Sequence, residues 1–122
     1  MAFNLLEKYK NIDCDYWKII RIIHDVVSNK LIVNIGLYQN EASRTDNVNN
    51  FVKTERLVFD YSMTTSIDTL DNVVSSAYVA IKNGEYENAP TEIVEENGKE
   101  VEKKINKFKD AQDVLTQRQK GF

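Results

Sequence analysis

The sequence has few of the residues that mark the commonest chemical classes of protein. Its single cysteine, Cys14, excludes an internal disulfide and a zinc site built from several cysteines. There is one histidine, His24, and no glycine-rich phosphate loop. One proline and four glycines in 122 residues leave little room for a flexible linker. These scarcities favour a chain made in a reducing cytosol that uses no cofactor, no metal and no small-molecule substrate.

Long apolar runs and an excess of positive charge are also missing. No run approaches the ~18 apolar residues of a membrane span. The opening letters, MAFNLLEKYK, lack the basic start and apolar core of a signal peptide. The formal net charge is −3, and the lysines between residues 99 and 109 are interleaved with acidic residues. The sequence therefore predicts neither a membrane nor a nucleic acid as a partner.

The residues that are present predict one globular domain over residues 1–122. Hydrophobic residues make up 42% of the chain and charged residues 29%, which is typical of a folded protein. A chain of this length buries about two-thirds of its unfolded surface, which is enough for a core that needs no disulfide or metal ion to stabilise it. We divide it into a sheet-plus-helix core, residues 1–86, and a hairpin arm with a C-terminal segment, residues 87–122.

The chain is organised around the stretch from Tyr16 to Tyr38. Two apolar, β-rich runs are joined there by Ser28-Asn29-Lys30, which predicts a long β-hairpin. Strict alternation divides the first strand into two faces: Trp17, Ile19, Arg21 and Ile23 against Tyr16, Lys18, Ile20, Ile22 and His24. Both faces are apolar at the centre, so we expect more apolar surface than one helix covers. Gly36 in the second strand predicts a bulge or a close backbone approach.

Three shorter segments complete the predicted sheet. Residues 3–9 predict a lead-in strand, with a short helix as the alternative. Residues 39–50 are polar and rich in asparagine, which predicts a contact loop with a helical turn from Glu41 to Arg44. Residues 51–61 predict a third strand that presents Leu57, Phe59 and Tyr61 on one face.

One segment carries a clear helical pattern. Its apolar residues recur at i, i+3, i+4, i+7, i+8 and i+11: Leu70, Val73, Val74, Ala77, Tyr78 and Ile81. This spacing predicts an amphipathic helix. Thr69 is the predicted N-cap, and Asn83-Gly84 the predicted C-terminal end.

Residues 91–104 contain Asn97-Gly98, the strongest short signal for a two-residue hairpin turn. Such a turn pairs Glu96 with Lys99, Val94 with Val101 and Glu92 with Lys103. A single charged helix is the alternative, since Lys and Glu favour helices. A two-stranded ribbon is marginal in water, so the predicted hairpin must lie on the sheet or reach a partner.

The last part of the chain predicts a short C-terminal helix, because its apolar residues fall at helical spacing: Ile105, Phe108, Ala111 and Leu115. The predicted fold class is therefore α+β. An antiparallel β-sheet of three to five strands packs with one main α-helix, and a charged C-terminal hairpin and the short helix follow.

Side chains that could carry chemistry are few and scattered. Asp13 and Asp15 flank Cys14, and His24 has no evident partner except Asp25, on the opposite face of the strand. We interpret the aspartates as an exposed turn before the strand, the thiol as buried or idle, and the histidine as a strand-end residue. The sequence does not predict an enzyme.

The surplus of apolar and aromatic side chains around the sheet predicts a protein interface. The candidate contact residues lie on the hairpin, the polar loop, the predicted arm and the C-terminus: Trp17, Arg21, Tyr38, Arg44, Phe51, Asn97, Gly98 and Phe122.

The order of segments resembles that of a known group of proteins. The pattern comprises MAFNLLEKYKNI, YWKIIRI, LYQNEASR, FVKTERLVFDY, AYVAIKN and FKDAQDVL, and it covers most of residues 1–85 with residues 108–115. It is similar to small virion proteins from the tail and structural modules of tailed bacteriophages that infect low-GC Gram-positive bacteria. The strand residues around Tyr38, Ala42 and Arg44 carry the likeness. This chain departs from it by an inserted Asn-Gly hairpin between Tyr86 and Phe108.

The resemblance implies a non-enzymatic structural component of a virion, located in the tail, baseplate or head–tail region. Its partners would be other virion proteins and copies of itself, and it would be made in the host cytoplasm before assembly into the particle. The alternative hypothesis is a small phage-encoded binding or regulatory protein that acts on a host protein.

Overall fold

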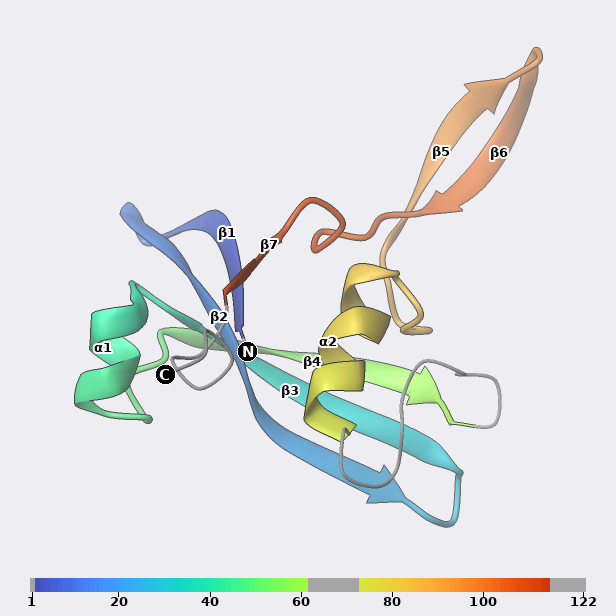
Figure 1. The fold of residues 1–122 in the computed structure, drawn as a ribbon. Coiled ribbons are helices and arrows are strands. Elements are labelled where there is room, and N and C mark those ends of the chain that lie inside the picture. The colour runs from blue at the N-terminus through green and yellow to red at the C-terminus, as the bar shows by residue number, and fades with distance from the viewer. Residues whose placement is uncertain (1, 62–72, 115–122) are drawn as a thin grey trace.

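The computed structural model describes residues 2–61 and 73–114, and Figure 1 shows their arrangement. The described chain is mainly antiparallel β-sheet with little helix. Its elements in chain order are β1 (Ala2–Tyr9), β2 (Ile12–Asp25), β3 (Lys30–Tyr38), α1 (Glu41–Asp46), β4 (Lys53–Asp60), α2 (Val73–Lys82), β5 (Thr91–Glu96), β6 (Lys99–Lys104) and β7 (Gln112–Val114).

The large sheet has the strand order β4-β3-β2-β1-β7, and β2 and β3 form the predicted central hairpin. Its turn is held by Asp25, whose Oδ1 accepts hydrogen bonds from the backbone N–H groups of Val27 (3.2 Å) and Ser28 (3.3 Å). Asn29 adopts the left-handed conformation (φ 53°), which asparagine tolerates better than most residues. The lead-in segment is a strand, so the alternative of a short helix for residues 3–9 is wrong.

A β-bulge in β2 corrects the predicted division of its side chains between two faces. Ile19 pairs with Ile35 but Arg21 pairs with Asn34, so Ile20 is an extra residue. After the bulge the alternation is inverted. Arg21 and Ile23 therefore share the face of Lys18 and Tyr16, whereas Ile22 and His24 share the face of Trp17.

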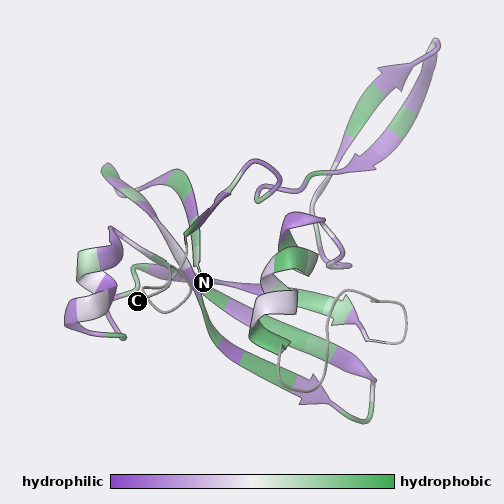
Figure 2. Cartoon of the chain, in the orientation of Figure 1, coloured by the Kyte–Doolittle hydropathy of each residue, from purple (hydrophilic) through white to green (hydrophobic). Residues whose placement is uncertain are grey.

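We call the face of the sheet that carries Trp17 the core face and the opposite face the outer face. On the core face, α2 and residues 86 and 108 cover the side chains of four strands. The core consists of Phe3, Cys14, Trp17, Leu31, Val33, Ile35, Leu37, Leu57, Phe59, Ala77, Tyr78, Ala80, Ile81, Tyr86, Phe108 and Ala111. In Figure 2 the hydrophobic colour is concentrated where α2 meets this sheet.

Helix α2 forms a hydrogen bond with β2 beyond the point where the pairing of β2 with β1 ends. The Tyr78 hydroxyl accepts a hydrogen bond from the backbone N–H of Ile19 at 2.7 Å, and burial raises the pKa of this phenol far above its usual value. Gly84 (φ 72°) ends the helix, as predicted, with the N–H of Gly84 bonded to Ile81 and that of Glu85 to Ala80. The predicted cap at Thr69, with Leu70, lies outside the described residues.

The prediction of a short C-terminal helix is wrong for residues 105–114. Residues 107–110 form a turn, and β7 then pairs with β1. This arrangement satisfies backbone groups at the edge of β1 that a helix would leave unpaired. It also places Phe108 edge-on against Trp17, with ring centroids 5.2 Å apart. The core thus extends past residue 86, and Leu115 lies outside the described residues.

Strands β5 and β6 form a separate two-stranded sheet, which we call the arm (residues 91–104). Its register is the predicted one, with Glu96 opposite Lys99 and Val94 opposite Val101, so the alternative of a single helix is wrong. Figure 1 shows the arm leaving the body near the end of α2 and pointing away from α1. At its base the N–H of Ile105 donates to the carbonyl of Pro90 at 2.7 Å.

The turn of the arm depends on Gly98. Its φ of 77° is left-handed, and a Cβ there would meet no atom within 4 Å, so only backbone strain opposes a side chain. We expect Gly98→Ala to loosen the arm by about 1 kcal/mol while the melting temperature of the body stays constant. Faster amide exchange in β5 and β6 alone would show this. Gly98→Asn should recover part of the loss, and equal exchange in wild type and Gly98→Ala would contradict the prediction.

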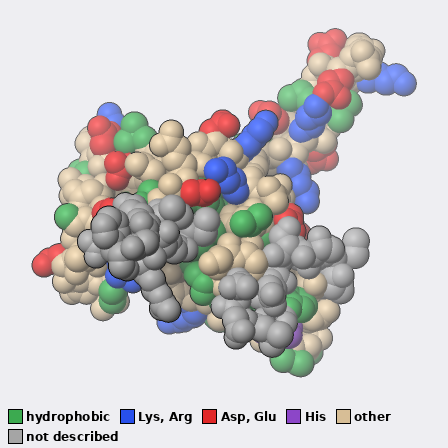
Figure 3. All heavy atoms as spheres, viewed as in Figure 1, with side chains coloured by type: hydrophobic (Ala, Val, Ile, Leu, Met, Phe, Trp, Pro, Cys, Tyr) green, Lys and Arg blue, Asp and Glu red, His purple; other side chains and the backbone are tan. Residues whose placement is uncertain are grey.

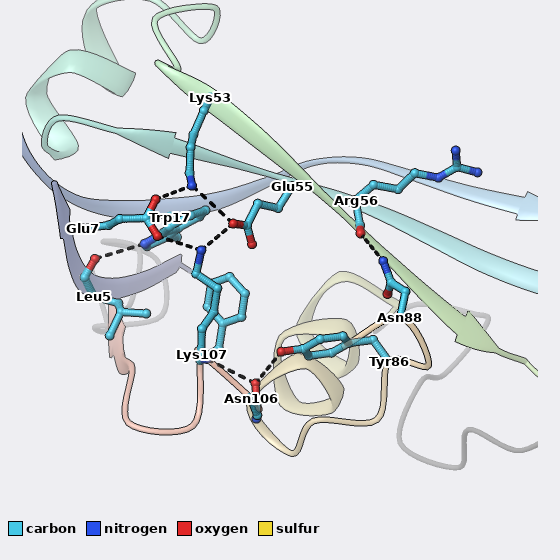
Figure 4. A network of polar contacts seen from close by, with 11 residues as sticks. Leu5, Glu7, Trp17, Lys53, Glu55, Arg56, Tyr86, Asn88, Asn106 and Lys107 are labelled. Atoms are coloured by element: carbon cyan, nitrogen blue, oxygen red, sulfur yellow. Dashed lines mark hydrogen bonds and ion pairs between the residues drawn. The ribbon is translucent and has the colours of Figure 1, made fainter. Parts of the chain in front are cut away.

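The outer edge of β4 is occupied by the segment that follows α2. The Asn88 side chain donates from Nδ2 to the carbonyl of Arg56 at 2.7 Å and accepts on Oδ1 from the N–H of Val58 at 2.9 Å (Figure 4). The backbone N–H of Glu87 donates to the carbonyl of Val58 at 2.7 Å. One amide side chain therefore takes the place of a neighbouring strand over two residues.

Candidate protein-interaction site

The side chains with potential chemistry are not brought together. Cys14 lies near the start of β2 and His24 near its end, roughly 30 Å apart along the strand. Cys14 is fully buried, and burial, followed by the charges of Asp13, Asp15 and Glu7, raises the pKa of its thiol. Within residues 2–61 and 73–114, no cluster of three or more His, Cys, Asp or Glu side chains could hold a metal ion.

His24 contacts an aromatic ring rather than an acid. Its ring centroid lies 5.0 Å from that of Tyr61, and its Nε2 is 3.5 Å from Oδ1 of Asn29 in the hairpin turn. The side chain is exposed. This is the arrangement of a strand-end histidine, as predicted.

Four charged side chains meet above Trp17, as Figure 4 shows. Lys107 contacts Glu7 (2.7 Å) and Glu55, and Lys53 contacts Glu7 and Glu55 (3.3 Å). The ammonium of Lys107 lies 4.8 Å from the centroid of the Trp17 ring, a cation–π distance. Every charge in this cluster has a partner of opposite sign. We interpret it as a clamp that holds the C-terminal segment on the sheet.

The ion pair between Glu7 and Lys53 in the clamp shows that the sheet is curved. Glu7 is on β1 and Lys53 is on β4, with β2 and β3 between them. In a flat sheet these two strands would lie about 14 Å apart. Direct contact between the two side chains therefore requires a sheet that curls toward its core face.

The clamp makes stability depend on pH through Glu7. Burial opposes ionisation of this carboxyl, but hydrogen bonds and the charges of Lys107 and Lys53 outweigh burial, so the pKa lies below its usual 4.5. The stabilisation is therefore complete above pH 4.5 and is lost as pH falls through the lower folded-state pKa. We expect Glu7→Gln to cost about 1–2 kcal/mol at pH 7 and progressively less below pH 4. Urea unfolding at several pH values measures this difference.

The control for this prediction is Glu92→Gln, because Glu92 is exposed on the arm and remote from the clamp. That variant should change the free energy of unfolding by less than ~0.5 kcal/mol. A Glu7→Gln penalty that is the same at pH 7 and pH 3 would show that the carboxylate charge has no part in the clamp.

A depression of about 600 Å³ opens on the outer face between the sheet and the loop that follows α1. It is lined by Ile19, Ile20, Arg21, Asn34, Tyr38, Arg44, Val48, Asn49, Phe51 and Thr54. Four predicted contact residues thus come together from β2, the end of β3, α1 and the loop before β4: Arg21, Tyr38, Arg44 and Phe51. The structure unites them through the bulge that turns Arg21 outward.

The wall of the depression is built by local hydrogen bonds. Asn40 caps α1 by accepting from the N–H of Ser43 at 2.8 Å, and Asn50 donates to the carbonyl of Ser43 at 3.0 Å. The Tyr38 hydroxyl donates to the carbonyl of Val48 at 2.6 Å. At Gly36 an added Cβ would lie only 3.2 Å from Cβ of Phe51, so the predicted close approach, rather than a bulge, explains this glycine.

The outer face is cationic. Arg21, Asn34 and Arg56 stand in one row across β2, β3 and β4, and Arg44 projects from α1 at the depression. Within residues 2–61 and 73–114, none of these three arginines forms an ion pair, and Nε of Arg44 is buried without a partner. Burial and the charge of Arg44 lower the pKa of nearby Lys18, although Glu41 opposes this.

The arm has two different faces. One carries the opposite-charge pairs Glu92–Lys103 and Glu96–Lys99 around Val94 and Val101. The other, which we call the acidic arm face, consists of Thr91, Ile93, Glu95, Glu100, Glu102 and Lys104. Here Glu95 stands directly opposite Glu100, a like-charge pair that destabilises the hairpin. Figure 3 shows this charged arm standing clear of the body.

The other predicted contact residues have different positions. Trp17 is fully buried beneath the clamp, so its prediction as a contact residue is corrected: the large ring belongs to the core. Tyr38 is also fully buried and supports the depression through its hydroxyl. Asn97 and Gly98 form the exposed tip of the arm, and Phe122 lies outside the described residues.

Sequence reasoning missed Arg56 and the Glu95–Glu100 pair. The glutamate pair was within reach, because the Asn97-Gly98 turn fixes which residues stand opposite each other. The cationic row was not, since the bulge at Ile20 leaves no mark in the alternation of residues.

Comparison with known proteins adds no relative: no family model, curated protein or solved structure matches this chain. Among residues 2–61 and 73–114, no helix has the length and apolar character needed to cross a bilayer. A functional proposal therefore draws on the arm, the outer face and the resemblance of the sequence pattern.

Proposed function

We propose that this chain is a non-enzymatic structural component of a bacteriophage virion, in its tail, baseplate or head–tail region. It acts through protein–protein interfaces with other virion proteins and with copies of itself. The observation that carries the proposal is the arm: fourteen residues, 91–104, fold into a hairpin that contributes no side chain to the core.

An isolated arm of this kind gains little stability from its own contacts, so we expect it to bind another protein. A two-stranded hairpin is marginal in water, and this one exposes Ile93 by 72%. Contact with a neighbouring subunit would cover that side chain and pair the charges of the acidic arm face. The resemblance to small virion proteins supplies the kind of assembly in which such contacts occur.

The geometry of the arm base allows a direct test. Pro90 and Ile105 are already hydrogen-bonded at 2.7 Å, so residues 91–104 can be replaced by a two-residue turn without opening the body. We expect the shortened protein to keep its melting temperature within a few degrees. In particles purified from a phage that encodes this chain, mass spectrometry should detect the full-length protein and strongly reduced amounts of the shortened one.

Two results would contradict the proposal. Absence of the full-length protein from purified particles would exclude a structural role in the virion. Recovery of one specific host protein with the tagged chain, with no virion protein, would support the alternative of a regulator that acts on the host. Equal incorporation of the shortened and full-length proteins would show that the arm makes no contact needed for assembly into the particle.

A further inference from the structure

The acidic arm face carries three carboxylates, of which Glu102 accepts a hydrogen bond from the Thr91 hydroxyl at 2.8 Å. Glu95 and Glu100 stand opposite each other at the tip, and Glu102 follows on the same face, where Lys104 is the one cation. No ion pair within residues 2–61 and 73–114 involves Glu95, Glu100 or Glu102. Like charges held directly opposite each other destabilise a hairpin unless cations lie close by. The arm is therefore best matched to a cationic surface.

The outer face of the same chain is such a surface. Arg21 and Arg56 are exposed on the strand row that passes through Asn34, and Arg44 adds a third guanidinium at the depression. Figure 4 shows the Arg56 side chain directed away from Tyr86 and Asn106, which lie against the core face. The arginine fork binds carboxylates with two parallel hydrogen bonds, so each arginine can hold one glutamate.

Apolar side chains lie within both charged surfaces. The acidic arm face presents Ile93, which is 72% exposed, and the outer face presents Ile20 and Ile23, which are 38% and 41% exposed. Ile20 lies at the edge of the depression beside Phe51. Burial of these side chains on contact would contribute affinity, while the charges would set register and partner choice.

We infer that the acidic arm face of one copy docks on the cationic outer face of a second copy. The inference rests on the proposed function, in which copies of this chain contact each other. Figure 1 shows the arm pointing away from α1, which forms one wall of the depression, so the arm is directed away from the depression of its own copy. The contact is heterologous: each copy offers an arm and receives one. Such contacts generate rings or open helical arrays.

Multi-angle light scattering and sedimentation of the purified full chain test this inference. Wild type should self-associate, and the association should weaken with added salt because charges guide it. Glu95→Gln with Glu100→Gln removes the repulsion within the arm, so this double variant should fold at least as well as wild type. Its dissociation constant for self-association should nevertheless rise about tenfold or more.

The matched control is Glu92→Gln with Glu96→Gln. It removes the same two charges from the same arm, but from the face that carries the opposite-charge pairs. Self-association should stay within about twofold of wild type. Equal loss in both double variants would mean that net charge, and not the acidic arm face, controls the contact, and would overturn the inference.

A charge exchange identifies the receiving surface. Glu95→Lys with Glu100→Lys should abolish association, and so should Arg21→Glu with Arg56→Glu. Each double variant alone should stay monomeric, because its arm and its outer face then carry charge of the same sign. A mixture of the two should associate, because each arm then meets an outer face of opposite charge. The quadruple variant, which carries both exchanges in one chain, should also regain association. Failure of the quadruple variant to associate, when its circular dichroism matches wild type, would overturn the inference.

The shape of the contact has its own signature. A copy without the arm keeps the outer face, and the Arg21→Glu and Arg56→Glu copy keeps the arm. A mixture of the two should form 1:1 heterodimers and nothing larger. A wild-type protein that stays monomeric at all concentrations would overturn this contact, but it would not decide whether the protein is part of the virion. Absence of the protein from purified particles would overturn the proposed virion role and would leave the contact between copies untouched.

Discussion

Replacement of Trp17 by alanine should lower the free energy of unfolding by about 3–5 kcal/mol, the cost of removing a large aromatic residue from a packed core. Trp17 is fully buried, packs edge-on against Phe108 and donates its indole N–H to the carbonyl of Leu5 at 3.0 Å. Its loss leaves a cavity and an unpaired Leu5 carbonyl, and it removes the cation–π contacts of Lys53 and Lys107 with the indole ring. Urea unfolding measures the effect. It is followed by circular dichroism, because Trp17 is the single tryptophan of the sequence and the variant therefore has no tryptophan fluorescence.

The control is Leu6→Ala, on β1. Leu6 is 68% exposed, so its truncation should cost less than ~0.5 kcal/mol. A Trp17→Ala variant that loses less than about 1 kcal/mol would mean that the indole is not packed as described.

Phe108→Ala should cost about 3–5 kcal/mol as well, although this residue lies beyond the arm in the sequence. Phe108 is fully buried, and its ring centroid is 5.2 Å from that of Trp17 and 5.9 Å from that of Phe3. The effect should reach β1 and the adjoining β7, because the same segment supplies Lys107 to the clamp. Thermal unfolding, with amide exchange resolved by strand, measures both.

Ile105→Ala serves as the comparison, because Ile105 is in the same segment but 38% exposed. It should cost about 1 kcal/mol or less. If Phe108→Ala raises exchange only in residues 105–114 and leaves the midpoint of unfolding unchanged, the C-terminal segment is an appendage and the prediction is wrong.

The sequence was sufficient for elements with strong local signals. The central hairpin, the C-terminal end of α2 at Gly84 and the register of the arm all follow from turn residues and side-chain periodicity. In each case the decisive interaction joins residues that are close in sequence. Local chemistry therefore determines the outcome before the rest of the fold is known.

Long-range pairing decided the elements that were predicted wrongly. Residues 105–114 have helical spacing, yet the open edge of β1 and the space beside Trp17 favour a turn and a strand there. The bulge at Ile20 also cannot be recognised in the sequence, because isoleucines at positions 19, 20, 22 and 23 form one β-forming run in which no residue marks an extra position. Neither feature can be derived without knowing which strands are neighbours.

The candidate site divides in the same way. Candidate contact residues in the polar segment after β3 or at the arm tip, such as Arg44 and Asn97, could be proposed from polarity and turn chemistry alone. Trp17 could not be placed, because a large aromatic residue is as common in a core as at an interface. Its burial depends on Lys107, ninety residues later, folding back over the ring.

The hydrogen bonds of Asn88 have a consequence for how the protein behaves in concentrated solution. An unpaired edge strand invites other chains to add strands, which leads to aggregation. At β4 the Asn88 amide and the N–H of Glu87 occupy the carbonyl and N–H groups of Arg56 and Val58 that an incoming strand would need. At high protein concentration these hydrogen bonds should oppose indiscriminate strand addition along the Arg56–Val58 part of this edge.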